Sequence, residues 1–165
     1  MPNFELNIQI PKGCGSISYF QLTPVPPAEG HAQPWTLTEN EGNGEPIDTI
    51  DVQFARGSDS LQRQSERCIL VISLDEDVQT EAFSWRFALN AVQYHSGCSD
   101  KLHDISTSLS ANGRTLSITI ESVASDSEQV NYSFVAALKN NQSGEVTIYE
   151  SSDPGIGIGR GKGGG

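Results

Sequence analysis

Ser151, Asp153 and Pro154 form a Ser-x-Asp-Pro stretch that carries the most distinctive chemistry in the sequence. The Asp153 carboxylate lies within reach of the carbonyl carbon of its own residue, so attack through oxygen closes a five-membered anhydride. The usual competitor is attack by the next backbone nitrogen, which proline prevents because it has no N–H. The leaving group is a tertiary amide, whose nitrogen is easier to protonate. The Asp153–Pro154 bond is therefore a candidate for cleavage assisted by one acid, with Ser151 hydrogen-bonding the junction.

The same residues are also typical of an ordinary turn. Asp and Pro are frequent where loops begin, because they favour turn conformations of the backbone. The chain contains eight prolines, so one Asp-Pro pair by chance is unsurprising. The dipeptide alone leaves both interpretations open.

An acid for such a cleavage is suggested by the end of the most apolar run. Residues 68–74 are apolar on both faces, which is typical of a central strand covered on two sides, and Asp75-Glu76-Asp77 follow directly. A carboxyl at the rim of a sheet can lose part of its hydration, which favours the protonated form that a general acid needs. We therefore take Asp75 as the candidate acid, with a solvated turn as the alternative.

A second group of polar side chains surrounds a loop. His95 and His103 flank a stretch that contains Cys98 and Asp100, and Asp104 follows. Such residues can bind a metal or form a Cys-His nucleophile. Their spacing matches no zinc pattern, and polar residues are common in loops, so we expect neither a metal nor a cofactor.

Charge and cysteine content restrict the class of function. The formal net charge is −11, and the tail after Asp153 carries +2, so the body carries −11 − 2 = −13. A body this acidic repels nucleic acid and anionic membranes. The three cysteines are widely spaced without a CxxC pair, which indicates free thiols. With no signal peptide or membrane-length apolar run visible, we expect a cytoplasmic protein.

The alternation of apolar and polar residues predicts an all-β protein with no convincing amphipathic helix. Asn112-Gly113 between two alternating runs is a strong hairpin signal. A change of parity near Ala91 indicates a bulge, and residues 61–67 suit a short helical turn. The natural architecture is an antiparallel β-sandwich of about nine strands, in which 17–22 returns after 4–10. The expected strands are 4–10, 17–22, 50–54, 68–74, 83–94, 105–110, 114–122, 132–138 and 146–149.

We expect one domain over residues 1–153 and a Gly-rich tail over 154–165. Within the domain, residues 23–47 form a long Pro- and Gly-rich loop, which Trp35 and Leu37 are candidates to anchor.

The tail has two open interpretations. Ile156 and Ile158 alternate with glycine, which favours an edge strand, whereas the entropy of glycine favours disorder. The Gly-x-Gly-x-Gly pattern is not a nucleotide fingerprint, because no helix follows to bind pyrophosphate. The terminal triglycine resembles the donor end of ubiquitin-like tags, but their β-grasp fold requires a helix that is not evident here.

The end of the sequence contains Asn131-Tyr132-Ser133-Phe134, a Gly turn, Tyr149 and Ser151-x-Asp153-Pro154-x-Ile156, with the Asn112-Gly113 hairpin before them. This pattern resembles the DP-EP family of small bacterial β-sandwich proteins. The resemblance covers about residues 69–158, so the first 60 residues look like an extension. The resemblance implies self-cleavage at the Asp-Pro bond, with Ser151, Asp153 and Pro154 as the matching residues and the released piece staying in the fold as a strand.

The resemblance also implies that the Asp can become linked to a lysine, and Lys139 is the lysine nearby in sequence. With a turn centred near Gln142, Asp153 faces about Asn131, which is 139 − 131 = 8 residues from Lys139. At about 3.3 Å per residue this separation is roughly 26 Å, too far for a direct link unless the chain doubles back. Cleavage without crosslinking and an amine from another molecule both remain open.

The sequence therefore predicts an autoprocessing endopeptidase of aspartic type acting on its own Asp153–Pro154 bond. The alternative is a non-enzymatic β-sandwich module for binding or assembly, whose tail adds a strand to a partner's sheet edge. The expected partners are its own C-terminal peptide and, in the alternative, a protein partner or further copies of the chain. Nucleic acid and membranes are not expected partners.

Overall fold

A computed structural model describes residues 5–31, 33–39, 44–96, 104–121 and 130–160. In this part of the chain ten strands and two short helical segments form. The strands are β1 (Glu5–Ile10), β2 (Gly15–Thr23), β3 (Thr36–Glu39), β4 (Thr49–Phe54), β5 (Arg67–Leu74), β6 (Phe83–Ser96), β7 (Asp104–Leu109), β8 (Thr115–Glu121), β9 (Val130–Asn140) and β10 (Val146–Arg160). The helical segments are α1 (Ser60–Ser65) and η1 (Glu76–Val78). The prediction of an all-β protein with about nine strands is confirmed.

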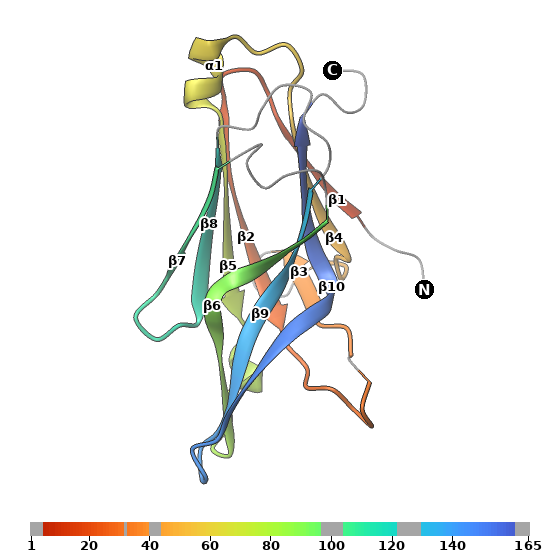
Figure 1. The fold of residues 1–165 in the computed structure, drawn as a ribbon, viewed down its shortest axis with the longest axis vertical. Coiled ribbons are helices and arrows are strands. Elements are labelled where there is room, and N and C mark those ends of the chain that lie inside the picture. Colours follow the sequence, from red (N-terminus) through yellow and green to blue (C-terminus); the bar gives the residue numbers. More distant parts are fainter. Residues whose placement is uncertain (1–4, 32, 40–43, 97–103, 122–129, 161–165) are drawn as a thin grey trace.

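The described strands form two five-stranded sheets. The first has the order β1-β4-β10-β9-β6, and the second has the order β3-β2-β5-β8-β7. The inward side chains of both sheets belong to one buried cluster, in which Leu70 and Ile118 of the second sheet join Val52 and Phe134 of the first. Figure 1 shows the two layers running side by side, with α1 at one end and the β9–β10 hairpin at the other. Among the described helices, none is long and apolar enough to cross a membrane.

Both sheets are mixed rather than wholly antiparallel. β4 pairs in parallel with β1 and with β10, and β2 pairs in parallel with β5. An alternating sequence cannot reveal this, because side chains alternate with a period of two in both kinds of sheet. The parallel partners are also far apart along the chain, where no turn signal connects them.

The beginning of the chain therefore differs from the prediction. Residues 17–22 do not return alongside 4–10, since β1 belongs to the first sheet and β2 to the second. The expected loop at 23–47 contains a strand, β3, which pairs with the end of β2. Trp35 and Leu37 anchor this segment in the core with exposures of 5% and 0%.

The centre of the chain follows the prediction closely, whereas the last strand, predicted over 146–149, extends in β10 from Val146 to Arg160. The turn at Asn112-Gly113 joins β7 and β8, and Gly113 has the positive φ of 72° that favours glycine. The pairing of β6 with β9 shifts between Phe87 and Val92, where Ala91 has a φ of 67°, so the bulge expected near Ala91 is confirmed. The helical turn expected at 61–67 is α1, which Asp59 begins with a capping box.

Candidate functional site

The Asp-Pro bond lies within β10, at an irregularity in its pairing with β9. Glu150 faces Val135, and the next paired residue, Gly155, faces Ser133. Residues 151–154 therefore stand opposite Phe134 alone, which makes an unusually large bulge. A bulge bends its strand, and Figure 1 shows β10 changing direction part of the way along its length. Pro154 is tolerated here because a bulge does not require its missing N–H.

At the bulge, the hydroxyl of Ser151 replaces a backbone carbonyl as the acceptor for the neighbouring strand. The backbone N–H of Phe134 donates a hydrogen bond to Ser151 Oγ at 2.9 Å. Both residues are buried, with exposures of 0% for Phe134 and 4% for Ser151. A buried N–H without an acceptor is costly, so the hydroxyl stabilises the bulge. The described hydrogen bond of Ser151 is thus with the neighbouring strand, and its part in a cleavage at the junction stays a prediction.

Gly155 holds the chain on the other side of the Asp-Pro bond. Its N–H donates to the carbonyl oxygen of Asp48 at 3.1 Å, where β4 begins. A Cβ atom at this position would lie 2.9 Å from the carbonyl oxygen of Tyr132. Only glycine therefore allows β10 to approach β9 this closely directly after the bulge. The junction is held by β9 before the bond and by β4 after it.

After the bulge, β10 is an interior strand. Residues 155–160 pair in parallel with β4 and, as far as Ile158, antiparallel with β9. Ile156 and Ile158 are each 1% exposed in the core. Of the two open interpretations of the tail, the strand therefore forms over residues 155–160, but it has a partner on both sides and is an interior strand rather than an edge strand. Residues 161–165 lie outside the described part of the chain.

The glycines of this segment lie beside buried polar side chains. Gly155 is paired with Ser133, Gly157 with Asp51 and Gly159 with Gln53. Ser133, Asp51 and Gln53 are only 6%, 5% and 3% exposed, and Gln53 Nε2 donates to Asp51 Oδ1 at 2.8 Å. The alternation of isoleucine and glycine is thus explained, since isoleucine fills the core while glycine leaves room beside the polar side chains of the neighbouring strands. The sequence interpretation missed Asp51, although it is a carboxylate in the alternating run of β4.

Asp75 lies in the other sheet, directly after β5. Its Oδ2 accepts from Thr23 Oγ1 at 3.1 Å, and its Oδ1 accepts from the backbone N–H of Asp77 at 2.9 Å. The carboxylate begins the short helical segment η1. These described contacts are within the second sheet and its loop. The side chain of Asp153 lies outside the described residues, so the role of Asp75 as its acid stays a prediction.

Lys139 is remote from the junction along β9. It faces Val146, whereas Gly155 faces Ser133, six residues away. At about 3.3 Å per residue this separation is roughly 20 Å. The register predicted from the turn holds as far as Glu150, and the bulge then shifts it. The structure therefore agrees with the argument that Lys139 is too far from Asp153 for a direct link.

The candidate metal or thiol loop falls largely outside the described residues. Cys98, Asp100 and His103 are not described, and of His95 and Asp104 only the backbone is. Where side chains are described, no group of three His, Cys, Asp or Glu residues could hold a metal ion. Cys68 is buried, and burial raises the pKa of its thiol to about 12, so this thiol stays protonated and unreactive at neutral pH.

The fold and the junction together define a β-sandwich protein whose last described strand carries an Asp-Pro bond inside a bulge. The family model of the DP-EP family matches residues 3–160, and the chain therefore belongs to the DP-EP family. The match includes the first 60 residues, so these are part of the family's domain rather than an extension. This is consistent with β1 and β2 pairing inside the two sheets.

Comparison with solved structures finds an inclusion body protein, PixA, of Burkholderia cenocepacia J2315. It has 10% sequence identity and a TM-score of 0.43, and the similarity covers 87% of this chain and 96% of that chain. No curated protein matches the sequence.

Proposed function

We propose that the protein is an autoprocessing endopeptidase that hydrolyses its own Asp153–Pro154 bond. The observation that carries the proposal is the bulge at 151–154. A hydrogen bond between Ser151 and Phe134 holds the chain before the Asp-Pro bond, and a hydrogen bond between Gly155 and Asp48 holds it after that bond. Fixing the chain on both sides of a bond restricts the conformations from which an intramolecular reaction must begin, and such restriction lowers the barrier. An unfolded chain lacks this advantage.

The reaction proceeds in two steps. A carboxylate oxygen of Asp153 attacks the carbonyl carbon of the same residue, and the bond from that carbon to the Pro154 nitrogen breaks. A general acid protonates the nitrogen, which leaves as the new N-terminal amine. Water then opens the five-membered anhydride and restores the side-chain carboxylate beside a new C-terminal carboxylate. The net change is the hydrolysis of one peptide bond by one water molecule, with no cofactor.

The simplest test is the intact mass of the purified full-length chain, followed over time at neutral pH. The expected products are residues 1–153 and 154–165. Asp153→Asn should stop the reaction, because an amide is a far poorer nucleophile than a carboxylate. Pro154→Ala should slow it, since a secondary amide leaves less readily. Cleavage of Asp153→Asn at the wild-type rate would overturn the proposal, provided that circular dichroism shows the same β structure in both proteins.

The acid is tested separately. Asp75→Asn should slow cleavage if Asp75 protonates the leaving nitrogen. Asp51→Asn is the matched comparison, because Asp51 is a buried carboxylate on β4, the strand that β10 joins after the bond. If only the Asp51 variant is slow, the acid predicted from the sequence is wrong while the cleavage itself stands.

An unbroken chain would favour the alternative, a non-enzymatic module for binding or assembly. One observation supports this second candidate. Ile17 and Tyr19 of β2 are 52% and 55% exposed, and they face Ile69 and Val71 across the β2–β5 pair. Such an apolar surface on a sheet is a common place for a protein partner. In this case the contact would use that surface, because residues 155–160 are already paired within their own sheet.

A further inference from the structure

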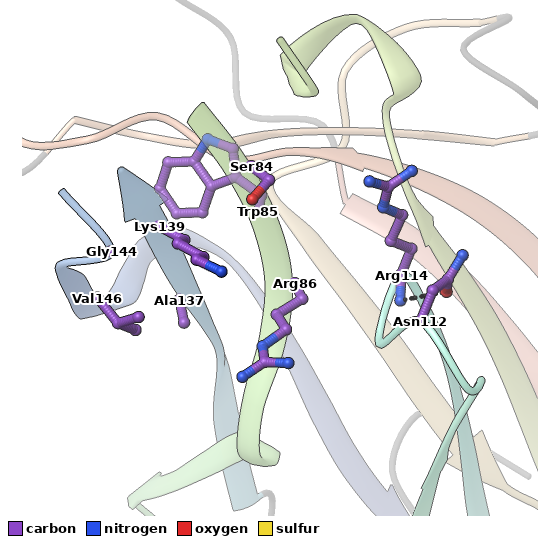
Figure 2. A pocket seen from close by; sticks show the side chains of 9 residues that line it. All are labelled: Ser84, Trp85, Arg86, Asn112, Arg114, Ala137, Lys139, Gly144 and Val146. Atoms are coloured by element: carbon purple, nitrogen blue, oxygen red, sulfur yellow. Dashed lines mark hydrogen bonds between the residues drawn. The ribbon is translucent and has the colours of Figure 1, made fainter. Parts of the chain in front are cut away.

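A hollow of about 350 Å³ lies across β6, towards the β9–β10 hairpin (Figure 2). Trp85 and Phe87 of β6 point into the core, with exposures of 4% and 3%. Ser84 and Arg86 alternate with them and therefore point to the outer face of the first sheet. Arg114, from the turn between β7 and β8, also lines the hollow, and Figure 2 shows it on the other side of β6 with its side chain pointing away from Arg86.

Small residues form the floor of the hollow and long cationic side chains form its walls. Arg86 faces Ala137 on β9, and Ser84 faces Lys139. Arg86 and Lys139 are thus diagonal neighbours, with backbone positions about 7–8 Å apart. Ala137 and Ser84 are too short to fill the space between them. Gly144 of the hairpin adds to the lining without a side chain.

The charge in the hollow is unusual for this protein. The chain has 10 Lys and Arg against 21 Asp and Glu, yet three of those cations and no acid line the hollow. Within the described residues, neither Arg86 nor Lys139 has an acid within 4.0 Å. Arg114 has one described ion pair, at 4.0 Å with Glu76, whose side chain is 83% exposed. Neighbouring cations without counter-charge repel each other, and a bound anion removes that repulsion.

We propose that this hollow binds a small multivalent oxyanion, a molecule with phosphate or carboxylate groups. The planar fork of Arg86 and the ammonium of Lys139 suit oxygen atoms of one such group, and the positive charge of Arg114 across β6 adds to the attraction for a multivalent anion. The volume is in the range of small-ligand sites. A cationic hollow of this size favours a small anion over a long polyanion, because a long polyanion would also be repelled by the rest of a chain whose formal net charge is −11. The site is independent of the proposed cleavage.

The test titrates the full-length protein with inorganic pyrophosphate at low ionic strength, followed by calorimetry or by amide chemical shifts. Saturable one-site binding is expected, with the shifts centred on β6 and the β9–β10 hairpin. Lys139→Gln should weaken the affinity about tenfold or more, because a charge-assisted contact is lost. Added sodium chloride should weaken it as well. Arg86→Gln should do the same as Lys139→Gln, with circular dichroism to verify its fold, because Gly113 packs against the Arg86 side chain.

Arg67→Gln is the matched control. Arg67 begins β5 in the other sheet and lies 3.9 Å from Glu121, so its removal changes the net charge equally without touching the hollow. A parallel titration with citrate distinguishes the two kinds of ligand group. Binding of pyrophosphate alone means that the hollow recognises phosphate groups, and binding of citrate alone means that it recognises carboxylate groups. Binding of both means that the hollow accepts either group. The proposal is wrong if neither binds at millimolar concentration, or if Lys139→Gln and Arg67→Gln weaken binding equally.

Discussion

Ser151 has a structural role in addition to any part in the proposed cleavage. Its hydroxyl accepts the N–H of Phe134 at 2.9 Å in a buried position, where water cannot replace it. The residue therefore holds the bulge whether or not the neighbouring bond is cleaved. A change at Ser151 should affect both stability and the proposed cleavage, because the two depend on the same backbone geometry.

Ser151→Ala should lower the free energy of unfolding by about 1–3 kcal/mol, since it leaves a buried donor without its acceptor. Chemical denaturation measures the change. Ser106→Ala provides the control, because Ser106 is exposed on β7 and its removal should cost less than about 0.5 kcal/mol. Equal stability of the two variants would mean that the hydrogen bond contributes nothing to the bulge. The measurement is best made on an Asp153→Asn background, which keeps the chain whole.

Cys68 makes the stability depend on alkaline pH. Burial raises the pKa of its thiol from 9.0 to about 12, so the thiol stays neutral in the fold where an unfolded chain would ionise it. The stabilisation is complete below pH 9 and is lost as the pH rises from 9 towards 12. Other groups also titrate in this range, and Cys68→Val isolates the contribution. The variant should lose less stability between pH 8 and pH 10.5 than the wild type, and equal losses would contradict the assignment.

At the scale of elements, β10 performs two different tasks on the two sides of its bulge. Before the bulge it forms a simple hairpin with β9, and after it the strand lies between β4 and β9. The change requires the close approach at Gly155, where a Cβ atom would meet the carbonyl oxygen of Tyr132. The bulge therefore sets both the position of the Asp-Pro bond and the docking of the segment that follows it.

Gly155→Ala should destabilise the protein by about 1–3 kcal/mol, because the new methyl group would lie 2.9 Å from a backbone oxygen that cannot move easily. Gly15→Ala is the matched control, also in a strand, where the nearest heavy atom would be 3.5 Å away. Thermal unfolding of both variants gives the comparison. If the two melting temperatures fall equally, the close contact at Gly155 is not what the position requires.

The predictable elements were those whose pairing is local. The Asn112-Gly113 hairpin and the β9–β10 turn follow from turn residues between alternating runs, and the bulge near Ala91 follows from a change of parity. The parallel pairing of β4 with β10 was not predictable, because it joins residues about a hundred positions apart with no connecting turn. The choice between a strand and disorder for the tail stayed open for the same reason. Glycine disfavours a strand unless the neighbouring strands require it, and here the buried polar side chains of β4 and β9 require the room that glycine leaves.

The candidate site was predictable in part. The chemistry of an Asp-Pro bond can be stated from the dipeptide. Ser151 was singled out beside it, and its hydroxyl accepts the N–H of Phe134, while its role in cleavage stays a prediction. The buried side chain of Asp51 was not found, since residues 50–54 alternate like any half-buried strand, in which Asp51 lies on the polar face. The cationic hollow was missed because Arg86, Arg114 and Lys139 are far apart in sequence and line one hollow only where β6 and β9 lie beside the turn between β7 and β8.

At the scale of the whole molecule, cleavage at Asp153–Pro154 would turn folding from a reaction of one chain into a reaction between two chains. The segment that begins at Pro154 supplies strand residues 155–160, with two isoleucines that are each 1% exposed. Burial of each isoleucine is worth about 1.5–3 kcal/mol. Backbone pairing with β4 and β9 adds to this, so the released piece should stay bound after the bond is broken. The native protein would then be a complex of two chains.

Such a complex unfolds with dissociation, whereas an intact chain unfolds alone. The melting temperature of the cleaved protein should therefore rise with protein concentration, because mass action favours the bound state. The uncleaved variant Asp153→Asn should melt at the same temperature at every protein concentration tested, for example over a range of about a hundredfold. Reversible melting followed by circular dichroism measures both.

After dilution from denaturant, the cleaved protein should also refold more slowly at lower concentration, and adding the synthetic peptide 154–165 should restore the rate. A melting temperature of the cleaved protein that does not change with concentration would show that residues 155–160 are not needed to hold the two sheets together.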